Sequence, residues 1–126
     1  MSLPPDVWKA ASVVALALVF VGAGVMHLVR PRMFEAIVPP SFPWPRAAVL
    51  VSGAAEIAGG IGLLVEPLRP WAGWGLVALA LAVFPANVYM AREAARFRRL
   101  APRWALWARL PLQFVLIGWI LWATTP

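Results

Sequence analysis

The sequence predicts an all-α membrane protein: a four-transmembrane-helix bundle, formed by a single domain that covers residues 1–126. Hydrophobic residues make up 63% of the chain and charged residues only 13%, whereas soluble domains carry about 25% charged residues. The mean hydropathy is +0.81. Because much of a small domain is surface, this many apolar residues must extend to the surface, and an apolar surface requires lipid around it.

Tryptophans and long apolar runs predict where the membrane-spanning segments begin and end. Indole rings gather at the membrane–water boundary, and the eight tryptophans fall at or near the ends of apolar runs: Trp8, Trp44, Trp71, Trp74, Trp104, Trp107, Trp119 and Trp122. The predicted spans are 7–29, 47–65, 71–91 and 105–123. Each is close to the ~20 residues that cross a ~30 Å hydrocarbon core. The first span is long and lacks a basic segment and a cleavage site, so we interpret it as a retained helix and not a signal peptide.

The basic residues predict the orientation. The connections 30–46 and 92–104 contain most of them: Arg30, Arg32, Arg46, Arg92, Arg96, Arg98, Arg99 and Arg103. The termini and the remaining turn contain only Lys9 and Arg69. Cytoplasmic loops carry the excess of basic residues. We therefore expect a multi-pass protein of the cell (inner) membrane, with both arginine-rich loops in the cytoplasm and both termini on the outer side. The net charge of +6 then reflects topology and anionic lipid headgroups, not nucleic-acid binding.

The two arginine-rich loops differ in character. In the first, "RPRMFEAIVPPSFPWP", Arg30-Pro31 predicts the start of a short helix, and the prolines at 39, 40, 43 and 45 exclude regular structure after it. Its apolar side chains predict a proline-rich interfacial loop that covers the cytoplasmic end of the bundle. The second, "AREAARFRRLAPR", is expected to continue the third span as an arginine-rich helical end with a solvated, lipid-facing surface.

All strongly polar side chains inside the spans fall in the predicted cytoplasmic half. They are His27, Glu56, Asn87, Arg109 and Gln113. Glu56 is the deepest, about nine residues or ~12–14 Å from the boundary. A charge at such a depth costs roughly 2.5–3.5 kcal/mol and usually faces a partner inside the bundle.

These residues predict one buried polar network that binds a ligand or exchanges protons. Arg109 and Gln113 share a helix face, and the long side chain of Arg109 could bridge the distance to Glu56. We therefore expect a Glu56–Arg109 ion pair, completed by Gln113, Asn87 and His27. The alternatives are that Arg109 extends to the headgroups and that His27 is an interfacial residue without a chemical role.

Small residues and a proline support an open space in this half. Residues at four-residue spacing allow helices to approach closely and leave room for a cavity beside Glu56. They are Ser52 with Glu56, Ala55 with Gly59, and the row Ala54, Ala58 and Gly62. Pro85 removes a helical hydrogen bond near Asn87. The resulting kink either opens the cytoplasmic end and frees a carbonyl, or serves packing alone.

Five stretches in order resemble the DoxX family of small four-helix membrane proteins. They are "VGAGVMHLVRP", "PRMFEAIVPPSFPWP", "SGAAEIAGGIGLL", "VFPANVYMA" and "RLPLQFVLIGWILW". The resemblance covers about residues 13–122. The residues that it carries over are His27, Pro31, Phe34, Pro39, Gly53, Glu56, Pro85, Asn87, Arg109, Pro111 and Gln113.

The resemblance implies an association with membrane redox or oxidative-stress complexes, since the family name derives from a subunit linked to a thiosulfate:quinone oxidoreductase. The composition of the chain limits the kinds of redox chemistry that it could carry out by itself. The chain has no cysteine, which excludes dithiol exchange and iron–sulfur clusters. It has one histidine, too few for bis-histidine haem ligation, and no metal-ligand spacing. Electron transfer would need a bound quinone or a partner subunit, and Glu56 or His27 would then donate to a quinone carbonyl.

Three functions remain open, and none of them defines an enzyme mechanism. The first is a quinone- or lipid-binding accessory subunit of a membrane redox complex. The second is a small proton-coupled transporter of lipophilic compounds with Glu56 as the proton-exchanging group, although the strong arginine bias argues against the dual insertion common among such transporters. The third is a structural or chaperone-like subunit whose polar residues only fix helix register. The expected partners are the lipid bilayer, redox subunits and a second copy in a homodimer.

Overall fold

The computed structural model describes residues 2–126 and contains four long helices: α1 (Val7–Val29), α3 (Pro45–Leu63), α4 (Arg69–Arg92) and α5 (Arg103–Thr124). Two short helices lie between them, α2 (Pro31–Glu35) and the 3₁₀ helix η1 (Glu66–Leu68), and this range contains no strand. All four long helices are long and apolar enough to cross a membrane. This confirms the predicted all-α class and the four long apolar helices, whose ends lie within two residues of those of the predicted spans.

Local sequence explains where the helices start. The Asp6 carboxylate accepts hydrogen bonds from the backbone N–H groups of Trp8 (2.8 Å) and Lys9 (3.1 Å), which caps the first turn of α1. Pro31 and Pro45 each occupy the first turn of their helices, α2 and α3, where a missing N–H costs nothing. The short helix α2 was predicted from Arg30-Pro31.

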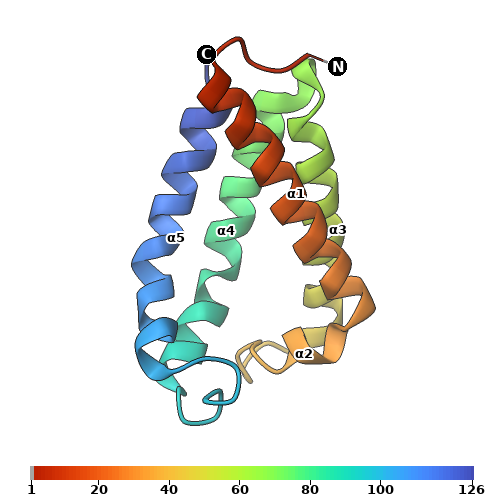
Figure 1. Ribbon diagram of the computed structural model, residues 1–126. Coiled ribbons are helices and arrows are strands. Elements are labelled where there is room, and N and C mark those ends of the chain that lie inside the picture. The colour runs from red at the N-terminus through yellow and green to blue at the C-terminus, as the bar shows by residue number, and fades with distance from the viewer. Residues whose placement is uncertain (1) are drawn as a thin grey trace.

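The four long helices form a closed ring in which α1 packs on α3, α3 on α4, α4 on α5, and α5 on α1. Figure 1 shows both termini at one end of the bundle, with α2 and the α4–α5 connection at the other. At the end with the termini, all four helices share an apolar core that includes the fully buried Val13, Leu16, Leu63 and Ile120. A second core lies at the opposite end and involves α4, α5 and the connection between them.

Helices α1 and α3 approach so closely at Gly24 and Gly53 that no side chain fits between them. A Cβ atom added to Gly24 would lie 2.5 Å from the carbonyl oxygen of Gly53, and one added to Gly53 would lie 2.7 Å from the Cβ atom of His27. Further along the same contact, a Cβ at Gly60 would lie 3.0 Å from the carbonyl oxygen of Ala17. Glycines are what allow such backbone contacts between helices in lipid.

Only some of the small residues in the predicted rows lie at contacts between helices. Ala54 and Ala58 are exposed, and Gly53 and Gly60 make the contact with α1 instead. Gly62 does pack, but against Ala72 of α4. Alanines would place Cβ atoms between the helices, whereas glycines have none. The closest approach of α1 and α3 therefore lies along the glycines.

The α4–α5 connection also differs from the prediction of a continued, solvated helix. Helix α4 ends at Arg92, and the chain then makes successive turns with hydrogen bonds from Arg96 N–H to the Glu93 carbonyl (3.0 Å) and from Leu100 N–H to the Phe97 carbonyl (2.9 Å). These turns bury Ala94 and Phe97 in the second core. Apolar side chains in an arginine-rich segment thus fold back to cover the ends of α4 and α5.

Candidate functional site

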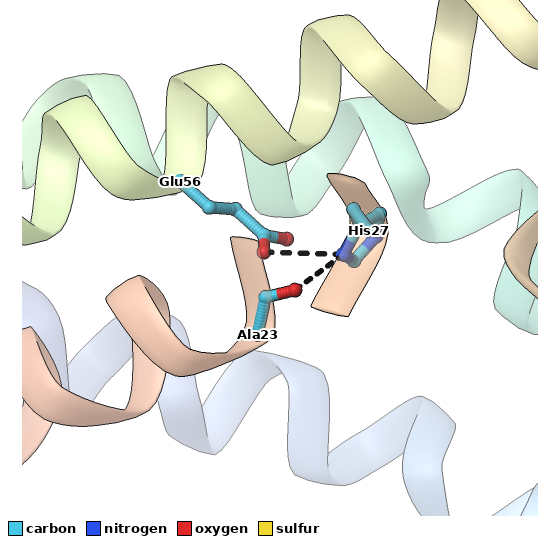
Figure 2. Close-up of polar contacts among 3 residues, drawn as sticks. All are labelled: Ala23, His27 and Glu56. Atoms are coloured by element: carbon cyan, nitrogen blue, oxygen red, sulfur yellow. Dashed lines mark hydrogen bonds and ion pairs between the residues drawn. The ribbon is translucent and has the colours of Figure 1, made fainter. Parts of the chain in front are cut away.

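His27 of α1 and Glu56 of α3 meet beside the glycine crossing. Figure 2 shows the two side chains pointing toward one another, with His27 Nδ1 3.6 Å from Glu56 Oε2. Both are largely enclosed, with side chains 14% and 12% exposed. Their contact joins a basic side chain of α1 to an acidic side chain of α3.

The direction of side chains on helices explains this meeting. A helical side chain leans toward the N-terminus of its own helix, and α1 and α3 run in opposite directions (Figure 1). Gly53 lies against the Cβ atom of His27, and Glu56 is nearly one turn further along α3. Because Glu56 leans back along α3 and His27 leans back along α1, the two converge.

The imidazole of His27 is held from two further directions. Its Nδ1 lies 2.7 Å from the carbonyl oxygen of Ala23 in the preceding turn (Figure 2). A proton on Nδ1 makes this hydrogen bond, and the neutral ring then presents the lone pair of Nε2 as an acceptor. The ring of Phe34 in α2 stacks on the imidazole at 3.8 Å between centroids, with 18° between the planes.

Helix α2 is itself tied to α3 by an ion pair. The Arg46 Nε donates to Glu35 Oε2 at 2.8 Å, and Glu35 directly follows Phe34 in the chain. The first loop therefore contributes an aromatic ring that covers His27 and a charged contact that holds this ring in place.

Glu56 Oε2 has no hydrogen-bond partner although it is buried. The 3.6 Å separation from His27 Nδ1 exceeds the 2.7–3.2 Å range of an N–H···O bond. Buried polar atoms are nearly always hydrogen-bonded, and an unsatisfied one costs about 1–3 kcal/mol, or more when it is charged. This oxygen therefore lacks the hydrogen bond that a buried carboxylate oxygen needs.

The predicted ion pair between Glu56 and Arg109 is wrong. Arg109 is exposed on α5, and Glu56 faces His27 instead. The reason is the order of helices in the ring, since α5 packs on α4 and α1 while α3 lies diagonally across the bundle. The alternative interpretation, an arginine side chain that extends along the surface toward the headgroups, fits this exposed position.

Gln113 and Asn87 belong to the other pair of helices. Gln113 Nε2 donates to the backbone carbonyl of Ala80 in α4 at 2.8 Å, and Asn87 is buried in α4, 5% exposed. Helix α4 continues through Pro85, whose missing N–H would otherwise serve Leu81. The structure thus divides the predicted network into a His27–Glu56 pair between α1 and α3 and a Gln113 contact between α5 and α4.

Sequence reasoning identified both members of the His27–Glu56 pair but did not pair them, and it assigned no role to Phe34. One signal could have paired them: His27 and Glu56 each follow a glycine by three residues, in consecutive and hence antiparallel spans. No comparable signal exists for Phe34, because the fold of a five-residue helix after Arg30 decides where its ring lies.

One protein family matches the chain over a range that includes the whole site. The sequence model of a family described as Domain of unknown function (DUF8561) matches residues 16–124. The chain belongs to this family. The matched range includes His27, Phe34 and Glu56, together with most of α1 and all of α3, α4 and α5. No curated protein and no solved structure matches the sequence.

Two arrangements of the proton leave the His27–Glu56 pair without net charge. Imidazolium with carboxylate and imidazole with carboxylic acid contain the same protons and differ only in which group holds one of them, so both forms are neutral overall. A neutral pair is tolerated in a low-dielectric interior, where isolated charges are costly. Among residues 2–126, no three or more His, Cys, Asp or Glu side chains gather as they would around a metal ion.

Proposed function

We propose that this protein is a multi-pass membrane subunit that binds a lipophilic, carbonyl-bearing ligand of the quinone class at the His27–Glu56 pair. The observation that carries the proposal is the buried Oε2 atom of Glu56, which lacks a hydrogen-bond partner. A ligand group at this oxygen would remove the cost of leaving it unsatisfied. The sequence resemblance to the DoxX family adds the redox context, in which the protein serves as an accessory to a membrane redox complex.

The proton chemistry of the pair supports this role. Glu56 in its acid form would donate a hydrogen bond to a quinone carbonyl, and an imidazolium form of His27, protonated on both ring nitrogens, would supply a proton to the Glu56 carboxylate. Phe34, stacked on His27 at 3.8 Å, gives the site an aromatic wall on the side of the first loop. The pair thus offers hydrogen bonding and proton exchange to a ligand whose remaining surface is apolar.

The basic loops support an orientation for this subunit in the inner membrane. We propose that α2, with Arg32, and the arginine-rich α4–α5 connection face the cytoplasm, as the positive-inside rule expects. The His27–Glu56 pair then lies in the cytoplasmic half, beneath the first loop, which we place at the interface. A quinone headgroup bound there would lie within reach of a partner docked on the cytoplasmic side.

Mass spectrometry of the organic extract from protein purified in mild detergent tests this proposal. The variants are Glu56→Gln, which keeps hydrogen bonding but loses proton exchange, and Glu56→Leu, which loses both. Glu93→Gln is the matched control, because Glu93 is exposed and far along the chain from the pair. The wild type and the control are expected to retain a quinone or related isoprenoid, and Glu56→Leu to lose it while remaining folded. The same bulk phospholipids in all four extracts would refute ligand binding.

A structural subunit is the second candidate, favoured by the Gly24–Gly53 crossing that His27 and Glu56 flank. In that case the pair serves only to align α1 and α3. Thermal unfolding separates the two candidates. A structural pair predicts that Glu56→Leu changes stability without changing any retained ligand, whereas a binding site predicts that ligand is lost even where the unfolding midpoint is unchanged.

A further inference from the structure

A second group of aromatic and polar side chains lies at the end of the bundle that carries both termini. There α1 and α5 are adjacent (Figure 1), and a groove between them is lined by Trp8, Ala11, Ser12, Ala15, Trp119 and Trp122. The small residues of α1 form its floor, and the indole rings form its walls. Trp119 Nε1 donates to Ser12 Oγ at 2.9 Å, which fixes one wall.

Lys9 provides a cation at the mouth of this groove. Its ammonium lies 5.5 Å from the centroid of the Trp122 ring, within the range of a cation–π contact. It also donates to the backbone carbonyl of Thr125 at 3.0 Å. An ammonium has three N–H donors, so these contacts position Lys9 and leave donors free.

The other charged groups at this end are already engaged. Arg69 is buried and donates to the carbonyls of Leu63 (2.7 Å) and Ser2 (2.5 Å). The Asp6 carboxylate caps α1, and Glu66 accepts from the Ser2 hydroxyl. Lys9 takes part in none of the ion pairs formed within residues 2–126. Its positive charge is therefore available to an anionic partner.

We propose that this groove binds an anionic phospholipid, with the phosphate on the Lys9 ammonium and one acyl chain between the indole rings. Charge and polarity select this occupant, because the groove is apolar apart from Ser12 and the Lys9 ammonium at its mouth forms no ion pair within residues 2–126. Tryptophans at the membrane boundary give the depth at which a glycerol backbone lies. The site is independent of the His27–Glu56 pair, which belongs to the α1–α3 contact.

Native mass spectrometry of the full chain in detergent, titrated with dioleoyl phosphatidylglycerol or phosphatidylcholine, tests this site. The wild type is expected to bind one phosphatidylglycerol about fivefold more tightly than phosphatidylcholine, the factor for ~1 kcal/mol per basic residue at an anionic surface. Lys9→Gln should abolish this preference and Lys9→Arg should keep it. Arg103→Gln, which removes an exposed charge at the opposite end, should also keep it.

Ala11→Leu tests the groove separately from the charge. Ala11 is exposed on the groove floor, so leucine is tolerated by the fold and occupies the space of the acyl chain. This variant should bind both lipids several-fold more weakly. Equal binding of the two lipids by the wild type, an unchanged preference in Lys9→Gln, an equal loss in Arg103→Gln, or unchanged binding by Ala11→Leu would overturn the proposal.

Discussion

Replacing Gly53 by alanine places a methyl group where two helices already touch. The added Cβ would lie 2.7 Å from the Cβ atom of His27 and 2.9 Å from the carbonyl oxygen of Gly24. Carbon atoms pack best at about 3.5–4.0 Å, so α1 and α3 must separate by roughly 1 Å at this point. Both close neighbours are backbone or Cβ atoms, which cannot rotate away as the end of a long side chain would.

The expected cost follows from this geometry. Overpacking a close contact costs typically about 1–3 kcal/mol, and the higher helix propensity of alanine offsets up to ~1 kcal/mol of it. After an offset of ~1 kcal/mol, we expect Gly53→Ala to lower the free energy of unfolding by up to about 2 kcal/mol. It should also move Glu56 away from His27, and so reduce retention of any ligand that needs both groups.

Thermal unfolding in detergent, followed by tryptophan fluorescence, measures this effect. Gly22→Ala is the matched control, because a Cβ at Gly22 in α1 has no neighbour within 4 Å. The control is expected to unfold at the same or a higher temperature than the wild type. If Gly53→Ala were as stable as Gly22→Ala, the close crossing would be wrong, and with it the geometry of the His27–Glu56 pair.

Three further changes test the remaining contacts. Gln113→Leu removes the hydrogen bond to the Ala80 carbonyl and should cost ~0.6 kcal/mol and at most ~1.7, as such bonds do between membrane helices; no loss in chemical unfolding would contradict that bond. A double-mutant cycle of Arg109→Gln with Glu56→Gln should give a coupling energy near zero, since these residues do not pair; a coupling above ~1 kcal/mol would restore the ion pair. Phe34→Leu removes the ring stacked on His27 and should cost about 0.5–1.5 kcal/mol beyond the lost area. The His27 ring resonances in NMR spectra should also lose their ring-current shift, and unchanged resonances would show that Phe34 does not cover the imidazole.

Much of the fold could be predicted because the formation of the long helices depends on the lipid expected around them. An apolar run that meets lipid must form a helix, since lipid offers no hydrogen bonds to the backbone. The ends of the four helices accordingly lie within two residues of the predicted spans. The connection after Arg92 could not be predicted in the same way, because arginine content indicates solvation while the burial of Ala94 and Phe97 depends on what they pack against.

The burial of Glu56 could be predicted from the sequence, but the identity of its partner could not. The depth of Glu56 in its span follows from counting residues along a helix, and a buried carboxyl needs a partner. The identity of that partner depends on which helix is adjacent. Arg109 offers the stronger charge but lies on α5, diagonal to α3, whereas His27 lies on the helix that the glycines bring close.

The sequence by itself determined the all-α class, the four helices long and apolar enough to cross a membrane and the polar residues inside them, because each of these follows from composition or from position along one helix. Only the tertiary structure decided that Glu56 meets His27, that Phe34 covers the imidazole, and that Gln113 serves α4. The physical reason is that partners across a bundle are chosen by helix order and by the closeness of backbones. Both arise from packing between segments, which no single segment encodes.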